Sequence, residues 1–261
     1  MADTLQTTDD RWTLSAIGVV AACLSAFGHE AFGHGGACLA AGGTVTLLTA
    51  THFSCEGGNI LVDAAGPLMN LVLAVMALGI LRGGAPRAPS TRWFLFLLGG
   101  INLCWFASEM VASPIVEHYD QAAIARQLGW PSVWRPVVLG LGLVLYFWTV
   151  RYARIVLRRD FAMGDRPTAV RRRFGVSHLA ATIAFVIAGL CWAREPLSGA
   201  LECFLTIGVA VAPLWFSLLP ARSPAEPPIA PVARSVPWIL CAVLFFAAFA
   251  LLQGRGIGRL A

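Results

Sequence analysis

Long apolar stretches follow one another along the chain and are separated by short polar segments. A helix needs about 20 predominantly apolar residues to cross a hydrocarbon core about 30 Å thick. The stretches that meet this length are 13–43, 60–82, 93–113, 136–157, 175–193, 199–220 and 236–253. The pattern therefore predicts an all-α polytopic membrane protein with six or seven transmembrane helices.

The first apolar stretch is followed by a segment of different character. At about 1.5 Å per residue, this stretch is longer than the bilayer is thick, so we expect its glycine-rich end to emerge from the membrane. The segment TVTLLTATHFSCEGGN then covers residues 44–59. Its β-branched residues and its closing glycines predict a short β-hairpin or loop at the membrane face.

The composition supports the membrane class. Hydrophobic residues make up 57% of the 261 residues and charged residues 13%, and the mean hydropathy is +0.71. The net charge of +5 arises mostly from one stretch of the chain, so we expect no nucleic-acid partner. The polar N-terminus lacks the basic leader of a cleavable signal peptide, so we expect the first span to remain in the mature protein.

Arginine placement predicts the orientation, because short cytoplasmic loops collect positive charge. All 19 basic residues are arginines. With the N-terminus inside, 14 of them lie on the cytoplasmic side and five on the other. Eight of the 14 lie between 151 and 173. We expect the segment RRDFAMGDRPTAVRRRF, at 158–174, to form a cytoplasmic loop and to contact the anionic lipid of the bilayer. We predict a multi-pass protein of the inner (plasma) membrane.

Three ionisable residues, His29, Glu30 and His34, lie within the first apolar stretch. A charged residue at the centre of a span costs at least about 2.5 kcal/mol, so such a group indicates a functional site. In the motif His-Glu-x-x-His, two histidines on one helical face hold zinc and the glutamate acts on a bound water. Here the second histidine comes one residue later.

The longer spacing requires a particular helix geometry. Positions five apart lie about 140° from each other around a regular α-helix, against about 40° for positions four apart. A π-bulge absorbs one residue and brings positions five apart onto one face, and Gly33 eases that distortion. We therefore predict a π-bulge with His29 and His34 as ligands. In the alternative the helix is regular and Glu30 and His34 are the ligands. His29 then does not bind the metal but orients the residues that do.

Two further segments extend the motif into a family resemblance. DAAGPLMNLVLAVMAL, at 63–78, resembles the Gly-Pro-x-x-Asn helix of the site-2 protease family of intramembrane zinc metalloproteases. SPIVEHYDQAAIARQLG, at 113–129, resembles in outline the segment that carries the family's aspartate ligand, and we expect Pro114 to break the third span there. The order and spacing of these segments match the family over residues 20–125. The lengthened motif, HExxGH, also resembles that of the soluble zinc peptidase dipeptidyl peptidase III.

The resemblance implies a role for each residue. It implies that His29, His34 and Asp120 bind Zn²⁺. It implies that Glu30 is the general base and later the acid for the leaving amine. Asn70 is implied to hydrogen-bond the substrate strand or the developing oxyanion. The substrate implied is a membrane protein or peptide, and the hairpin offers an edge with which an unwound substrate can pair.

The same resemblance divides the chain. Residues 1–130 are predicted to form a catalytic core of three transmembrane segments. Residues 131–261 are predicted to add further transmembrane helices, which match nothing in the family. The sequence predicts no particular oligomeric state.

Departures from the family pattern leave alternatives open. Asp120 is followed by Gln121 where the family has glycine, and Glu109, Glu117 and His118 are alternative ligands. The arginine count places the motifs towards the outer face, whereas the family has its site nearer the cytoplasm. The second functional hypothesis is a catalytically inactive relative that binds or regulates membrane partners. A metal-dependent oxidase requires more histidines, and a transporter typically shows an internal repeat.

The seven cysteines are an odd number, and all except Cys55 lie in apolar stretches. We expect them to be small packing residues rather than a disulfide framework. His52, Cys55 and Glu56 are expected to form a polar turn rather than a second metal site.

Overall fold

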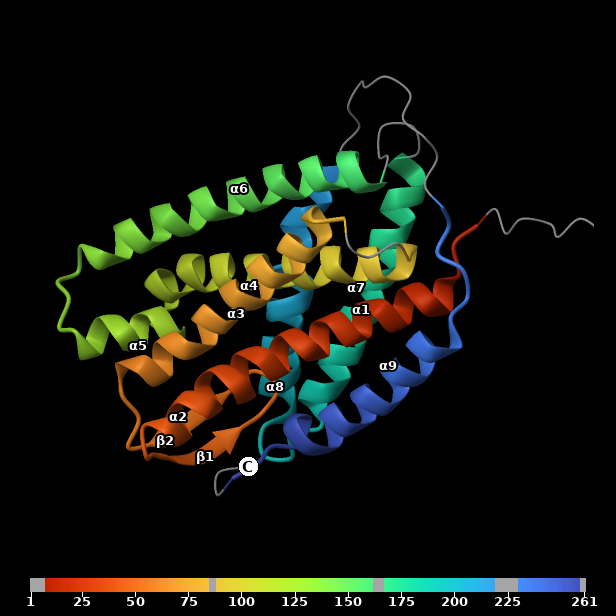
Figure 1. The fold of residues 1–261 in the computed structure, drawn as a ribbon. Coiled ribbons are helices and arrows are strands. Elements are labelled where there is room, and N and C mark those ends of the chain that lie inside the picture. The colour runs from red at the N-terminus through yellow and green to blue at the C-terminus, as the bar shows by residue number, and fades with distance from the viewer. Residues whose placement is uncertain (1–7, 85–87, 162–166, 219–229, 259–261) are drawn as a thin grey trace, which may run out of the picture.

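The computed structural model describes residues 8–84, 88–161, 167–218 and 230–258, which form a bundle of long helices with one small sheet (Figure 1). Seven helical stretches within these residues are long and apolar enough to cross a membrane, which confirms the predicted all-α polytopic fold. They are Arg11–Ala40, Ile60–Arg82, Pro89–Val116, Trp134–Phe161, Thr168–Leu190, Pro196–Leu218 and Val236–Gly254.

Three of the seven stretches change helix type along their length. The first consists of α1 (Arg11–Ala26), the π-helix η1 (Phe27–Gly35) and α2 (Gly36–Ala40). The sixth consists of α8 (Pro196–Cys203), the π-helix η2 (Phe204–Val209) and the 3₁₀-helix η3 (Ala212–Leu218). The seventh consists of α9 (Val236–Phe249) and the π-helix η4 (Ala250–Gly254).

The other four stretches are single α-helices, and a short helix lies beside them. The four are α3 (Ile60–Arg82), α4 (Pro89–Val116), α6 (Trp134–Phe161) and α7 (Pro167–Leu190). The short helix α5 (Tyr119–Gln127) is too short to span a bilayer and packs against α3 and α4.

Helix α1 lies at the centre of the bundle and packs against α4, α7 and α9. The closest approach is at Gly18, where an added Cβ would lie 2.1 Å from the carbonyl oxygen of Ser177. Ser177 Oγ donates to the carbonyl of Leu14 at 2.9 Å and accepts from Trp93 Nε1 at 3.0 Å. The C-terminal spans are therefore packed directly onto the first span, and the proposed division at residue 130 remains a prediction.

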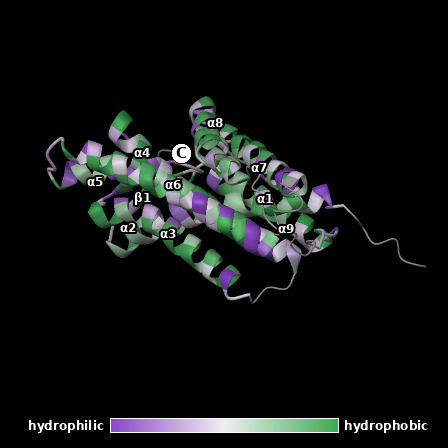
Figure 2. Ribbon diagram, turned by 90° about the horizontal axis from the view of Figure 1, so that it is seen from above, coloured by the Kyte–Doolittle hydropathy of each residue, from purple (hydrophilic) through white to green (hydrophobic). Residues whose placement is uncertain are grey.

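Apolar residues occur along all the long helices (Figure 2), and several helices expose apolar side chains on the outside of the bundle. Helix α6 buries few of its side chains and exposes Leu141, Phe147 and Trp148. Helix α3 likewise exposes Val75 and Met76. These findings establish a multi-pass membrane protein.

The predicted hairpin is present as strands β1 (Thr44–Leu48) and β2 (Phe53–Glu56), which pair antiparallel with an irregularity between Val45 and Leu47. Its position is fixed by two further contacts. Leu48 exchanges two backbone hydrogen bonds of 2.9 Å with Ile257, and Gln253 Nε2 donates to the Thr49 carbonyl at 2.9 Å. The end of the seventh span therefore holds the hairpin against the bundle.

The expectation that the cysteines only fill space is wrong for two of them. Cys38, in α2, and Cys55, in β2, form a disulfide. This pair was not predicted from the sequence, because Cys38 lies in a long apolar stretch. In the structure the helix that contains Cys38 continues as far as the hairpin, where Cys55 lies. Cys23, Cys104 and Cys203 are buried free thiols, as predicted.

Two expectations about chain breaks are also corrected. Pro114 lies inside α4, which continues to Val116. A proline removes one backbone hydrogen bond and crowds the carbonyl four residues earlier, yet α4 continues for two residues beyond Pro114. The predicted loop at 158–174 is shorter in the structure, since α6 runs to Phe161 and α7 begins at Pro167. Residues 162–166, and most of the proline-rich segment 221–234, lie outside the described residues.

Candidate metal centre

The π-helix η1 brings the two histidines of the first span together, as the five-residue spacing predicts. The Nε2 atoms of His29 and His34 lie 3.2 Å apart, and the side chains are buried, with 2% and 4% of their surfaces exposed. Gly33 also allows close packing between η1 and α3. A Cβ there would lie 2.8 Å from backbone atoms of α3, so glycine allows η1 and α3 to touch.

Asp120, at the start of α5, completes a group of three candidate ligands. Its Oδ2 lies 3.4 Å from His29 Nε2 and 3.3 Å from His34 Nε2. Among the described residues, these three form the only group whose ligand atoms converge closely enough to hold a metal ion. Glu30 is not in the group, so the geometry favours the arrangement with both histidines over the alternative with Glu30 and His34.

The size of this triangle matches a zinc site. Nitrogen and oxygen ligands bind tetrahedral zinc at about 2.0–2.1 Å, which places neighbouring ligand atoms about 3.3–3.4 Å apart. The three separations of 3.2, 3.3 and 3.4 Å therefore have the dimensions of one face of a zinc tetrahedron. Two imidazoles and one carboxylate are also a donor set that zinc accepts. The residues present fit the ion that the motif implies.

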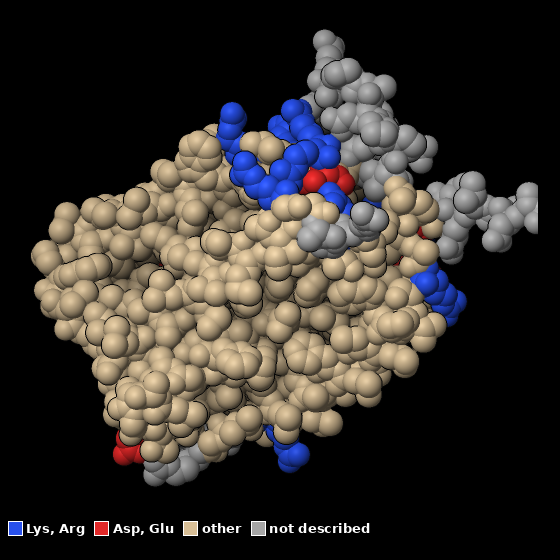
Figure 3. All heavy atoms as spheres, in the orientation of Figure 1, with Lys and Arg blue, Asp and Glu red and all other residues tan. Residues whose placement is uncertain are grey.

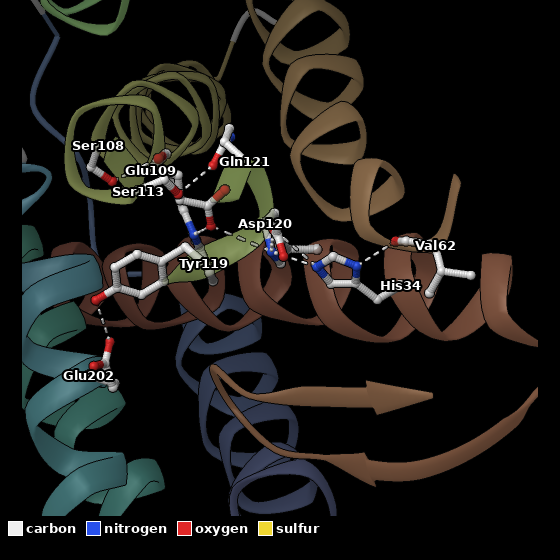
Figure 4. A network of polar contacts seen from close by, with 11 residues as sticks. His34, Val62, Ser108, Glu109, Ser113, Tyr119, Asp120, Gln121 and Glu202 are labelled. Atoms are coloured by element: carbon white, nitrogen blue, oxygen red, sulfur yellow. Dashed lines mark hydrogen bonds and ion pairs between the residues drawn. The ribbon is translucent and has the colours of Figure 1, made fainter. Parts of the chain in front are cut away.

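His34 is fixed in the orientation that a ligand needs. Its Nδ1 lies 2.7 Å from the carbonyl oxygen of Val62, on α3, so Nδ1 carries the proton and Nε2 offers its lone pair (Figure 4). The ring stacks on Phe53 of β2 at 5.2 Å. Gly66 of α3 leaves room for it, because a Cβ there would lie 2.2 Å from His34 Nε2.

His29 is held by two residues of α4. The indole of Trp105 stacks on its ring, with centroids 4.7 Å apart and planes 16° from parallel. Trp105 Nε1 donates to Glu109 Oε1 at 2.7 Å, and the same oxygen lies 3.6 Å from His29 Nε2. Glu109 is one of the alternative ligands predicted from the sequence. Trp105 was not predicted, because a tryptophan in an apolar span gives no indication that it stacks on a histidine.

The carboxylate of Asp120 is well suited to bind a cation. Burial opposes its ionisation, but the imidazoles of His34 and His29 outweigh burial and hold the pKa of Asp120 well below its ordinary value. The adjacent Tyr119 points the other way and donates its hydroxyl to Glu202 Oε2 of α8 at 3.1 Å (Figure 4). Burial and the Glu202 carboxylate raise the pKa of Tyr119 to about 12, so this hydroxyl remains a donor.

The two predicted catalytic residues are buried beside this centre. Glu30 is 3% exposed, and electrostatic interactions link its carboxylate to His34 and Asp120. Asn70 lies on α3 one turn after Gly66, on the same face of the helix, and is fully buried. Both polar atoms of its side-chain amide lack a hydrogen-bond partner in the structure. A buried amide with nothing to bind is costly, so this residue indicates a position for a polar ligand.

The remaining candidates are not part of the group of three converging ligands. The carboxylate of Glu117 pairs with Arg135 at 2.9 Å, and His118 precedes α5 and contacts Tyr119. His52, just before the hairpin's second strand, contacts Trp192, with ring centroids 4.9 Å apart and planes tilted by 40°. Burial lowers the pKa of His52, which favours its neutral form.

No protein-family model, curated protein or solved structure matches this chain. The resemblance to site-2 proteases therefore stays a prediction that rests on the three motifs.

Proposed function

We propose that this chain is an intramembrane zinc metalloprotease that hydrolyses a peptide bond in or next to the membrane. The observation that carries the proposal is the triangle of His29 Nε2, His34 Nε2 and Asp120 Oδ2, with sides of 3.2 to 3.4 Å, buried at the end of a transmembrane helix. A structural site would close all four corners of the zinc tetrahedron with protein ligands, whereas three protein ligands and one open corner are typical of catalytic zinc.

The chain's own residues divide the work of hydrolysis. A zinc ion held at this triangle supplies Lewis acidity, which polarises a carbonyl and lowers the pKa of water to about 7. Glu30, next to the ligand His29 in the sequence, takes the proton from the attacking water and delivers it to the leaving amine. Asn70 donates its amide N–H to the oxygen that gains negative charge. The buried setting strengthens both interactions by excluding bulk water.

The hairpin supplies a means of presenting the substrate. A peptide bond inside a helix is shielded, so a transmembrane substrate must unwind before it is cut. Strand β1 already pairs with Ile257 at Leu48, whereas β2 passes directly beside the centre, where Phe53 stacks on His34. We infer that an unwound substrate pairs with β2 and thereby lies across the three ligands.

The centre is inferred to open on the extracytoplasmic side of the plasma membrane. Arginines gather at the end of the bundle where α6 ends and α7 begins (Figure 3), which short cytoplasmic segments favour. The Cys38–Cys55 disulfide lies at the opposite end, beside the hairpin, and such bonds form in oxidising compartments outside the cytoplasm. Both observations favour a substrate that is cut near its extracytoplasmic end, unlike the arrangement expected from the family.

The alternative function is a catalytically inactive relative that binds or regulates membrane partners. The two are separated by a cleavage assay with a transmembrane peptide, using zinc-loaded wild type and Glu30→Gln. Loss of the general base should lower the rate about 100- to 10,000-fold while the zinc content stays unchanged, because Glu30 is not a ligand. Equal rates in both proteins would contradict the assigned role. Zinc binding with no cleavage of any tested peptide by wild type would favour the inactive relative.

A further inference from the structure

The turn between α4 and α5 has an unusual backbone. Glu117 and Tyr119 adopt positive φ angles of 54° and 68°, a region that non-glycine residues rarely occupy. These are the two non-glycine residues with positive φ among the described residues, and Asp120 follows directly. Strained residues of this kind persist only where surrounding contacts fix them, and they cluster at functional sites.

Local contacts fix the Glu117 side of the turn. The guanidinium of Arg126 donates to the Glu117 carbonyl at 2.9 Å, and Arg135 pairs with the Glu117 carboxylate at 2.9 Å. Ser113 Oγ donates to Gln121 Oε1 at 3.0 Å and so ties the end of α4 to the first turn of α5. All these partners lie within 18 positions of Glu117 in the sequence.

The Tyr119 side of the turn is fixed from a distant part of the chain. The Tyr119 hydroxyl donates to Glu202 Oε2 at 3.1 Å, across 83 positions of sequence. Glu202 lies on α8, in the sixth span, and is partly buried. Figure 4 shows that Tyr119 and Asp120 point in different directions from the same turn, one towards Glu202 and the other towards the histidines.

We propose that the Tyr119–Glu202 hydrogen bond positions Asp120 at the metal centre, and that both residues are positioning residues. The hydrogen bond to Glu202 on α8 holds Tyr119 in its left-handed conformation. The backbone at Tyr119 in turn sets the position of the next residue, Asp120. Without this hydrogen bond the turn relaxes towards negative φ, and Asp120 Oδ2 leaves the position 3.3 Å from His34 Nε2. The inference rests on the proposed zinc site and gives the sixth span, which lies outside the predicted catalytic core, a role in that site.

The test is the zinc affinity of full-length protein in detergent, measured by competition with a chelator. Tyr119→Phe and Glu202→Leu each remove the hydrogen bond and should weaken zinc binding about 10- to 100-fold, as loss of contacts that orient a ligand does. Glu202→Gln keeps an acceptor oxygen and should restore affinity to within about threefold of wild type. The double variant Tyr119→Phe/Glu202→Leu should bind no more weakly than the weaker single variant, because both changes remove one interaction.

A matched control separates positioning from general stability. Tyr146 donates its hydroxyl to the Ala210 carbonyl at 2.9 Å, in a part-buried contact between α6 and the sixth span. Tyr146→Phe therefore removes a similar bond and should leave zinc affinity unchanged. The absorption spectrum of the Co²⁺-substituted protein should change in Tyr119→Phe and not in Tyr146→Phe, since only the former alters the ligand geometry.

The outcomes are distinguishable. Wild-type affinity in Tyr119→Phe, or equal losses in Glu202→Gln and Glu202→Leu, would overturn the positioning role and leave the zinc site standing. Equal losses in Tyr119→Phe and Tyr146→Phe would show a general effect and would also overturn it. Wild-type protein that binds no zinc would overturn the proposed function and this role with it.

Discussion

The two ends of the first span carry buried polar groups of contrasting kinds. Where the span begins, Asp9 Oδ1 and Oδ2 accept from Arg173 at 2.7 and 2.8 Å, and Oδ1 also accepts from the Val232 backbone at 2.9 Å. Arg173 donates in addition to the Ala230 carbonyl at 3.0 Å. Among these groups only Nη1 of Arg173 lacks a partner.

At the other end, around η1, several buried polar atoms are left open. The atoms without a partner are His29 Nδ1, Glu109 Oε2 and both polar atoms of the Asn70 amide. Burial without a hydrogen bond costs free energy, so folding alone would select against such groups. The first cluster has the hydrogen bonds expected of a group that stabilises the fold, whereas the open atoms of the second are what we expect around the proposed metal centre. Substitutions at the Asp9 end should therefore lower stability and leave the proposed activity unchanged. Substitutions around η1 should lower the proposed activity without lowering stability.

The largest effect is expected at the Asp9 end and should appear in stability. Asp9→Ala removes one partner of a buried ion pair and should lower the free energy of unfolding by about 3 to 5 kcal/mol, because Arg173 is left uncompensated. The adjacent Asp10 caps α1 by accepting from Thr13 N, and Asp10→Ala should cost only about 1 kcal/mol. Denaturant unfolding in mixed micelles measures both. Zinc content should be unchanged in each variant. Zinc loss in folded Asp9→Ala would contradict the separate roles of the two ends of the first span.

Asn70→Leu should have the opposite profile. Loss of an oxyanion donor should lower the cleavage rate about 100- to 1,000-fold. Stability should rise by up to about 1 to 3 kcal/mol, because an unsatisfied buried amide is replaced by an apolar group of similar size. The rate and the unfolding midpoint are measured on the same preparation.

A second buried asparagine sharpens this prediction. Asn102 differs from Asn70 in that its Nδ2 donates to Ser25 Oγ and to the Leu98 carbonyl, both at 2.8 Å, although its Oδ1 has no partner. Asn102→Leu should therefore lower stability by about 1 to 3 kcal/mol and leave the cleavage rate close to that of wild type. Destabilisation of Asn70→Leu by a similar amount would show that Asn70 is an ordinary packing residue.

Crowding at the metal ligand gives a smaller effect. Gly66→Ala places a Cβ 2.2 Å from His34 Nε2, so the ring must shift, and a displacement of about 1 Å costs about 100-fold in rate. Gly79 lies on the same helix with nothing within 4 Å of an added Cβ, so Gly79→Ala is the matched control. It should retain full activity and zinc. Wild-type rates in both variants would mean that His34 is not a ligand.

Much of the fold follows from local sequence signals. Seven apolar stretches predicted the seven spans, and the β-branched residues and closing glycines of 44–59 predicted the hairpin. The spacing of His29 and His34 predicted the π-helix, because only that geometry places residues five apart on one face. These features depend on helix and strand periodicity, which a single sequence carries.

The features that sequence analysis missed depend on contacts between distant segments. Cys38 pairs with Cys55 because the first helix extends to the hairpin, and the stacking of Trp105 on His29 depends on how α4 lies against η1. The Tyr119–Glu202 bond joins the two predicted halves of the chain. Residue types at these positions are ordinary for apolar spans and polar turns, so only the packing of the helices reveals what they contact.

The proposed zinc site is tested by the metal content of the purified protein, measured by mass spectrometry without chelator. We expect about one zinc per chain in wild type, and its loss in His34→Ala and in Asp120→Ala. His52→Ala, which changes a histidine that contacts Trp192 and is not part of the triangle, should retain the zinc. Wild-type protein without zinc, or zinc that persists in both ligand variants, would contradict the account.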